Sequence, residues 1–232
     1  MNKGFFADAL ASRPLLWEAM LRANSRPVPS SLPASCPAAP YVGKFMDLFG
    51  EGAASLLSWL AETSVSARSG QDARDAGFWD YAEESRRLAL LDAETLAALS
   101  LVAGVALHAP EIARVLRREE LLNLRAGIGE DLYRYALCRG QYQLGTVRRL
   151  FAQLDLSFPL AERCALHGSM ATRLVAARWP EELAKRVFLA LPPLPEGREV
   201  PAFSEAEVRE VWIALKKLLL KEVAPSWAPC FD

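Results

Sequence analysis

Two pairs of side chains in this chain have types and a spacing that chemistry could use. Cys164 and His167 lie one helical turn apart, a separation at which a histidine can take the proton of a thiol and leave a nucleophilic thiolate. His108 and Glu111 have the same spacing, and a dimetal helical bundle needs Glu-x-x-His units repeated on facing helices. No oxyanion loop or orienting acid is evident near the first pair, and no repeat accompanies the second. We therefore expect both pairs to be structural.

The sequence also lacks the common catalytic and metal-binding motifs. The pair Gly127-x-Gly129 has no third glycine and follows no predicted strand, so it fails the dinucleotide-binding fingerprint. Neither a P-loop nor a GxSxG motif occurs. Widely spaced cysteines with no CxxC pair argue against a disulfide framework or a zinc site and favour reduced thiols: Cys36, Cys138, Cys164 and Cys230. The sequence thus predicts that the protein is not an enzyme and holds no cofactor and no metal.

Arginines are concentrated between residues 111 and 149. This region holds eight arginines against five acidic residues, a local excess of three positive charges. The excess has three interpretations: a solvated surface crossed by ion pairs at helical spacing, a face for an acidic protein, or a face for nucleic acid. The formal net charge of −1 gives no reason to expect nonspecific binding to nucleic acid. The candidate partner-binding residues are Arg114, Arg117, Arg118 and Arg134.

The longest apolar helix pattern lies just before these arginines, between Asp92 and Ala109. After Glu94 this run is uncharged, and its leucines and valines recur at the i, i+3, i+4 spacing of a buried helix. Asp92 is the expected N-cap, where a side-chain oxygen accepts a backbone N–H. About 15 uncharged residues are fewer than the roughly 20 that a membrane span requires. The pattern therefore predicts a core helix.

The arginine-bearing region is expected to form the next helix. Pro110 is predicted to open it, because the missing N–H of proline costs nothing in a first turn. Gly127 is predicted to end it with a positive φ, and Gly129 is the alternative residue for that role. Its apolar side is predicted to consist of Ile112, Val115, Leu116, Leu121, Leu122 and Leu124.

Prolines divide the rest of the chain into further helices and irregular segments. Helices are expected to restart at Pro14, Pro159 and Pro180, and the pattern over 41–62 indicates a helix in two pieces. Three aromatic residues, Phe78, Trp79 and Tyr81, are expected to pack over the central helices, with a binding anchor as the alternative. Irregular chain is predicted over 24–40, a proline-rich strap, over 64–77, a polar loop, and over 192–201.

The C-terminal region carries its own helix signature. Ser204 and Glu207 have the spacing of a capping box. We expect this helix to pack back on the core, and seating in a partner groove is the alternative. Its apolar stripe consists of Val208, Val211, Trp212, Leu215, Leu218 and Leu219.

The fold class follows from these patterns together with composition. Alanine and leucine dominate and only three isoleucines occur, which favours helix over sheet. A chain of 232 residues with 52% hydrophobic and 24% charged residues can bury a sizeable core. The sequence predicts an all-α protein: a compact multi-helix domain over 1–191, a linker over 192–203, and a C-terminal amphipathic helix and tail over 204–232.

The run LALLDAETLAALSLVAGVALHAPEIARVLRREELLNLRAGIGEDLYRYALCRG, residues 88–140, resembles the central region of the SctK family of type III secretion sorting-platform proteins, of the YscK and PscK kind. The resemblance combines a leucine-rich helix, an HAPEIARVL-like turn into an arginine-bearing helix, and a Gly-Glu-Asp-Leu-Tyr start to the next. It extends over most of residues 5–191. The family has no catalytic residues, so no site residue carries over from it.

The resemblance implies a cytosolic adaptor. Such a protein bridges the cytoplasmic forkhead-like domain of the inner-membrane ring protein SctD to the SctQ pods, in an assembly with SctL and the export ATPase. This implies a place at the cytoplasmic side of the inner membrane through protein partners, without membrane insertion and without nucleic acid. The N-terminal residues are not expected to form a secretory signal, because Asp8 interrupts the apolar residues early. The alternative function is a small helical regulator that binds nucleic acid through its arginines.

Overall fold

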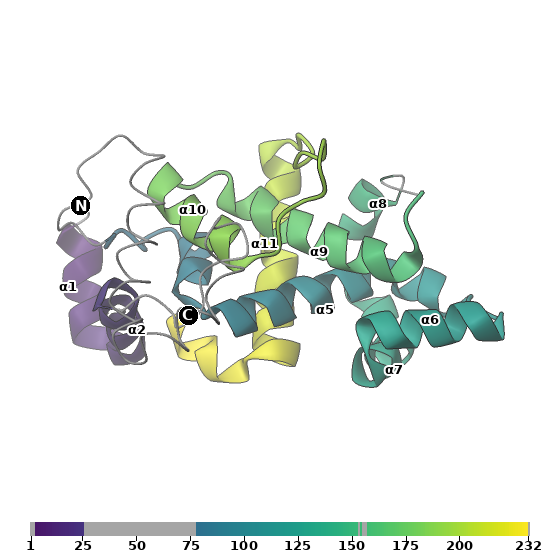
Figure 1. The fold of residues 1–232 in the computed structure, drawn as a ribbon. Coiled ribbons are helices and arrows are strands. Elements are labelled where there is room, and N and C mark those ends of the chain that lie inside the picture. Colours follow the sequence, from purple (N-terminus) through teal and green to yellow (C-terminus); the bar gives the residue numbers. More distant parts are fainter. Residues whose placement is uncertain (1–2, 26–77, 153, 155–156, 232) are drawn as a thin grey trace, which may run out of the picture.

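The computed structural model describes residues 3–25, 78–152, 154 and 157–231. Every regular element within these residues is helical and none is a strand, which confirms the predicted all-α class. Figure 1 shows α1 and α2 at one end of the molecule and α6 and α7 at the other. The α-helices are α1 (Lys3–Ser12), α2 (Pro14–Ser25), α5 (Ala93–Ile112), α6 (Arg118–Ile128), α7 (Glu130–Cys138), α8 (Val147–Phe151), α9 (Leu160–Ala176), α10 (Glu181–Ala190) and α11 (Glu205–Leu218). The shorter helical turns are η2 (Glu84–Leu90), η3 (Gly140–Tyr142), η4 (Leu219–Val223) and η5 (Pro225–Cys230).

The fold is organised around α5 and α9, which lie side by side and antiparallel (Figure 1). Two glycines let the backbones touch: a Cβ on Gly104 would lie 1.7 Å from the carbonyl oxygen of Cys164. A Cβ on Gly168 would lie 1.8 Å from the carbonyl oxygen of Ser100. The hydroxyls of Ser100 and Thr172 share a hydrogen bond of 2.8 Å across the same seam. Small residues therefore fix how closely the two central helices approach.

The start of α5 is as predicted. The carboxylate of Asp92 accepts a hydrogen bond from the Thr95 backbone N–H at 2.7 Å, which confirms the expected N-cap. By length and composition alone α5 could span a membrane, but 67% of its most apolar window is buried inside the protein. This burial is what a core helix of a soluble protein shows.

The end of α5 differs from the prediction. Pro110 does not open a new helix but lies inside α5, which continues to Ile112. Because proline has no N–H, it leaves the carbonyl of Ala106, four residues earlier, without its helical donor. The guanidinium of Arg148 supplies the missing bond, donating from Nη2 to the Ala106 oxygen at 3.0 Å. The side chain of Arg148 thus replaces the backbone donor that proline lacks, and α5 continues past Pro110.

The boundary between α6 and α7 also corrects the prediction. Gly127 lies inside α6, and the prediction that it has a positive φ is wrong. Gly129, the alternative, has a φ of 87° and joins the two helices. Gly127 is needed for another reason: a Cβ there would lie 2.6 Å from the Cβ of Ala161 on α9. The first glycine permits close packing, and the second permits the turn.

The C-terminal helix α11 packs on the core. Its capping box is present, with Ser204 accepting from the Glu207 backbone N–H and Glu207 accepting from that of Ser204. The residues between α10 and α11 form no helix, as predicted. Further on, Arg87 donates from Nη1 to the Cys230 carbonyl at 2.9 Å and ties the chain end to η2. The apolar stripe is buried at Val208, Val211, Leu215, Leu218 and Leu219.

The aromatic residues after the polar loop pack within the protein. Tyr81 is fully buried, and its ring meets that of Phe78 edge to face at 5.3 Å. The ring of Trp79 packs against that of Trp17 of α2, with 5.7 Å between the ring centroids. This contact joins the N-terminal helices to the rest of the protein. The predicted strap, polar loop and helix over 41–62 lie outside the described residues, except that residues 24 and 25 complete α2.

Candidate functional site

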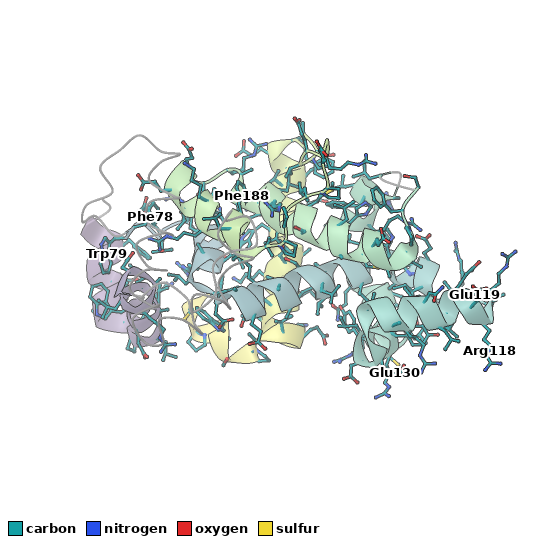
Figure 2. All side chains as sticks on the ribbon, in the orientation of Figure 1. Phe78, Trp79, Arg118, Glu119, Glu130 and Phe188 are labelled. Carbon is teal, nitrogen blue, oxygen red and sulfur yellow. The ribbon has the colours of Figure 1, made fainter. Side chains whose placement is uncertain are left out.

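Three of the four candidate arginines lie in the turn between α5 and α6 and at the start of α6. Arg114 lies in the turn after α5, Arg117 immediately precedes α6, and Arg118 is the first residue of α6. We call these three residues the basic tip. Figure 2 shows Arg118 and the neighbouring Glu119 at the outer end of α6. Arg134 lies separately, on the exposed side of α7.

Local ion pairs account for only part of this charge. Arg117 approaches Glu120 at 3.3 Å with 84% of its side chain exposed, and Arg134 approaches Asp131 at 3.9 Å. Exposed pairs of this kind contribute about 0–1 kcal/mol. Arg114 and Arg118 form no ion pair with any residue that the structure describes. The interpretation as a self-paired solvated surface therefore holds for two of the four arginines.

Apolar side chains are exposed at the same end. Leu116 is 90% exposed and precedes α6, and Leu122 is 54% exposed, so these two members of the predicted apolar side are not covered by the protein. The reason is the turn after Ile112, which ends α5 and leaves α6 to contact the body mainly through Leu124 and Ile128. The first turns of α6 project away from the core. Leucines that would stabilise a core by about 1.5–3 kcal/mol each are left in water.

Behind the basic tip, a chain of polar side chains joins α5 to α9. Arg163 donates from Nη2 to one carboxylate oxygen of Glu111. The other oxygen of Glu111 lies 3.2 Å from Nδ1 of His108, and Nε2 of His108 lies 2.9 Å from Nδ1 of His167. We call these four residues the histidine network. Its two imidazoles and the guanidinium are buried, whereas Glu111 remains partly exposed.

Protonation in the histidine network follows from burial and neighbouring charge. Burial lowers the pKa of His108 to about 4, and the nearby His167 and Arg163 act in the same direction. Burial alone would raise the pKa of Glu111, but its hydrogen bond and attraction to Arg163 outweigh this and lower it. With Glu111 ionised, Nδ1–H of His108 donates to the carboxylate, and Nε2 of His108 accepts from Nδ1–H of His167.

The structure supports the expectation that Cys164 is structural. Its side chain is fully buried, and burial raises the pKa of the thiol to about 12. A thiol with this pKa stays protonated near neutral pH and is a poor nucleophile. The part of the chain that the structure describes holds no cluster of three or more metal-binding side chains.

A cavity of about 310 Å³ opens between the basic tip and the histidine network. The polar part of its wall includes Arg148, which caps the Ala106 carbonyl, and Arg114 of the basic tip. Three residues of the histidine network also line it. The apolar part of the wall comes from α5 and from the end of α8. The described residues that line the cavity are Leu107, His108, Pro110, Glu111, Arg114, Arg148, Phe151, Ala152 and Arg163.

Sequence reasoning found the arginines but missed this arrangement. Glu111 binds Arg163 from α9, which is 52 residues away and therefore outside any helical spacing. His108 and His167 are 59 residues apart, so no local spacing indicates that they meet. The one signal in the sequence was that both histidines of the chain lie in helical segments that contain many small residues.

Comparison of this chain with protein-family models, with curated proteins and with solved structures finds no match. The likeness to the SctK family therefore rests on the residues quoted above.

Proposed function

We propose that this protein is an adaptor of a type III secretion sorting platform, as the resemblance to the SctK family implies. It links the cytoplasmic domain of SctD to SctQ, and through SctQ to SctL and the export ATPase. It acts at the cytoplasmic side of the inner membrane, held there by protein partners. Its work is recognition, without catalysis and without a cofactor.

The observation that carries this proposal is the basic tip with Leu116 at its centre. An apolar side chain that is 90% exposed stands between arginines on both sides in sequence. Arginine is enriched where proteins bind one another, and apolar surface gains energy when a partner covers it. Complementary charges around such a contact set partner choice and orientation. The surface therefore suits an acidic partner face with an apolar depression.

The charge pattern favours a protein partner over nucleic acid. Glu119 and Glu120 occupy the first turn of α6 beside Arg118, where they suit the positive end of the helix dipole. Carboxylates among the arginines repel phosphate, whereas an acidic protein face can place its own charges between them. Salt separates the two cases, because the affinity of a phosphate-neutralising protein falls steeply with salt.

Charge reversal at the basic tip tests the adaptor proposal. We expect Arg117→Glu combined with Arg118→Glu to weaken binding to the SctD cytoplasmic domain or to SctQ at least about tenfold, because each lost charge pair becomes a repulsion. Binding is measured by calorimetry with the purified partners, and a thermal melt in parallel should be unchanged. The matched control is Lys217→Glu, which reverses an exposed charge on α11, away from the tip.

Two outcomes contradict the proposal at different levels. Unchanged binding of the double variant to both partners removes the basic tip from the interface. Failure of the unmodified protein to bind either partner removes the adaptor function.

A further inference from the structure

The cavity behind the basic tip carries positive charge that the described residues of its wall do not neutralise. Among the residues that the structure describes, Arg114, Arg148 and Arg163 line it, and Glu111 is the only carboxylate in its wall. His108 adds no charge near neutral pH. The described part of the wall therefore has two guanidinium charges in excess of its carboxylate.

Arg148 is fixed in place without being neutralised. It donates from Nε to the Leu107 oxygen at 2.9 Å and from Nη2 to the Ala106 oxygen at 3.0 Å. Longer contacts from Nη2 reach two further carbonyls, those of Gly140 and Gln141. These acceptors are neutral backbone groups, so they hold the guanidinium rigidly while its charge remains.

The carboxylate of Glu111 is already engaged. Glu111 accepts from Arg163 through one oxygen and from His108 through the other. Arg114, at the mouth, has no ion pair with any described residue. Arg163 is buried, and its Nε has no hydrogen-bond partner among the described residues. The charge of Arg114 and that of Arg148 are thus available to a ligand.

We propose that this cavity binds a dianionic oxyanion, inorganic phosphate or the head of a phosphate monoester. Arg114 closes over the ligand from the mouth, and Arg148 supplies a fixed positive wall. The planar guanidinium of Arg114 suits phosphate because it can donate two parallel hydrogen bonds to one anion. Leu107, Pro110 and Phe151 exclude water from one side and strengthen the attraction. The proposal is independent of the adaptor function.

The histidines provide a direct probe of the site. The chain contains only His108 and His167, so an imidazole ¹⁵N spectrum shows these two residues alone. Because His108 lines the cavity, inorganic phosphate titrated into the full chain should shift its resonances saturably near neutral pH. Sodium chloride at matched ionic strength should leave them in place. Calorimetry under the same conditions gives the dissociation constant.

Two variants locate the binding. Arg114→Gln should weaken phosphate binding about tenfold or more, because a charge-assisted contact is lost. Arg149→Gln is the matched control, since Arg149 is exposed, adjacent to Arg148 and absent from the cavity wall. It should bind phosphate as the unmodified protein does. Thermal melts of both variants verify that the fold is retained.

Each outcome bears on the proposal. Glycerol 3-phosphate binding more tightly than phosphate assigns the site to monoesters, and the reverse order assigns it to free phosphate. Linear, unsaturable shifts, or equal shifts with chloride, overturn the proposal. Equal weakening by Arg114→Gln and Arg149→Gln also overturns it, because the effect is then one of general surface charge.

Discussion

The buried imidazole of His108 ties the stability of the fold to pH. Burial lowers its pKa from 6.5 to about 4, with His167 and Arg163 acting in the same direction and Glu111 opposing them. Between these values the unfolded chain binds a proton that the folded chain does not. The free energy of unfolding should therefore fall as the pH drops from about 6.5 to about 4, by up to about 3 kcal/mol.

Urea melts across this pH range measure the effect. In His108→Gln the part due to His108 should disappear, although the variant is less stable throughout. Glu111 contributes lower in the range: its depressed pKa gives stability that is lost as the pH falls below the ordinary value of 4.5. A profile for the unmodified protein that is flat above about pH 4.5 would contradict the neutral buried imidazole.

The roles of residues that bond to near neighbours in the sequence were predictable, and the roles of residues that bond to distant parts of the chain were not. Asp92 and Ser204 cap helices through bonds to residues three positions on, a distance that the sequence displays. The role of Pro110 depends on Arg148, which lies 42 residues from the carbonyl that it caps. No residue near Pro110 in the sequence indicates that a distant side chain will supply this hydrogen bond.

At the scale of elements, the close contact between α5 and α9 predicts that a methyl group at Gly104 strongly destabilises the fold. Gly104→Ala should destabilise the protein by about 3 kcal/mol or more, because its Cβ would meet a backbone carbonyl at 1.7 Å and the helices must move apart. Chemical denaturation measures the change. Gly145→Ala is the matched control, since its Cβ would have no neighbour within 4 Å and its φ is not positive. A Gly104→Ala variant as stable as Gly145→Ala would contradict the packing.

Alanine at Gly127, inside α6, and at Gly129, between α6 and α7, should destabilise the protein for different reasons. Gly129→Ala should cost about 1 kcal/mol through its φ of 87° and leave the contact of α6 with α9 intact. Gly127→Ala has ordinary backbone angles but presses on Ala161, so the additional change Ala161→Gly should restore stability to it and not to Gly129→Ala. Equilibrium melts of the single and double variants test this. Rescue of both, or of neither, would contradict the assignment.

Helix content was predictable over the described residues, but the ends of α5 and α6 were not. Periodicity identifies an apolar face, and it does not say which part of that face finds a partner helix. The stretch from 112 to 124 has helical spacing throughout, yet a turn divides it and leaves Leu116 in solvent. The cavity could not be predicted for the same reason, because its wall forms only when α5, α8 and α9 pack together.

At the scale of the whole molecule, the exposed leucine at the basic tip separates folding from recognition. Leu116→Ser should leave the melting temperature unchanged, because a side chain that is 90% exposed contributes little to the core. If the basic tip contacts SctD or SctQ, the same change should weaken that binding about tenfold, since it removes apolar area from the interface. Calorimetry with each purified partner measures it. Ile213→Ser, 57% exposed on α11, is the matched control and should bind normally. Equal affinities for the two variants would leave charge alone as the recognition element of the tip.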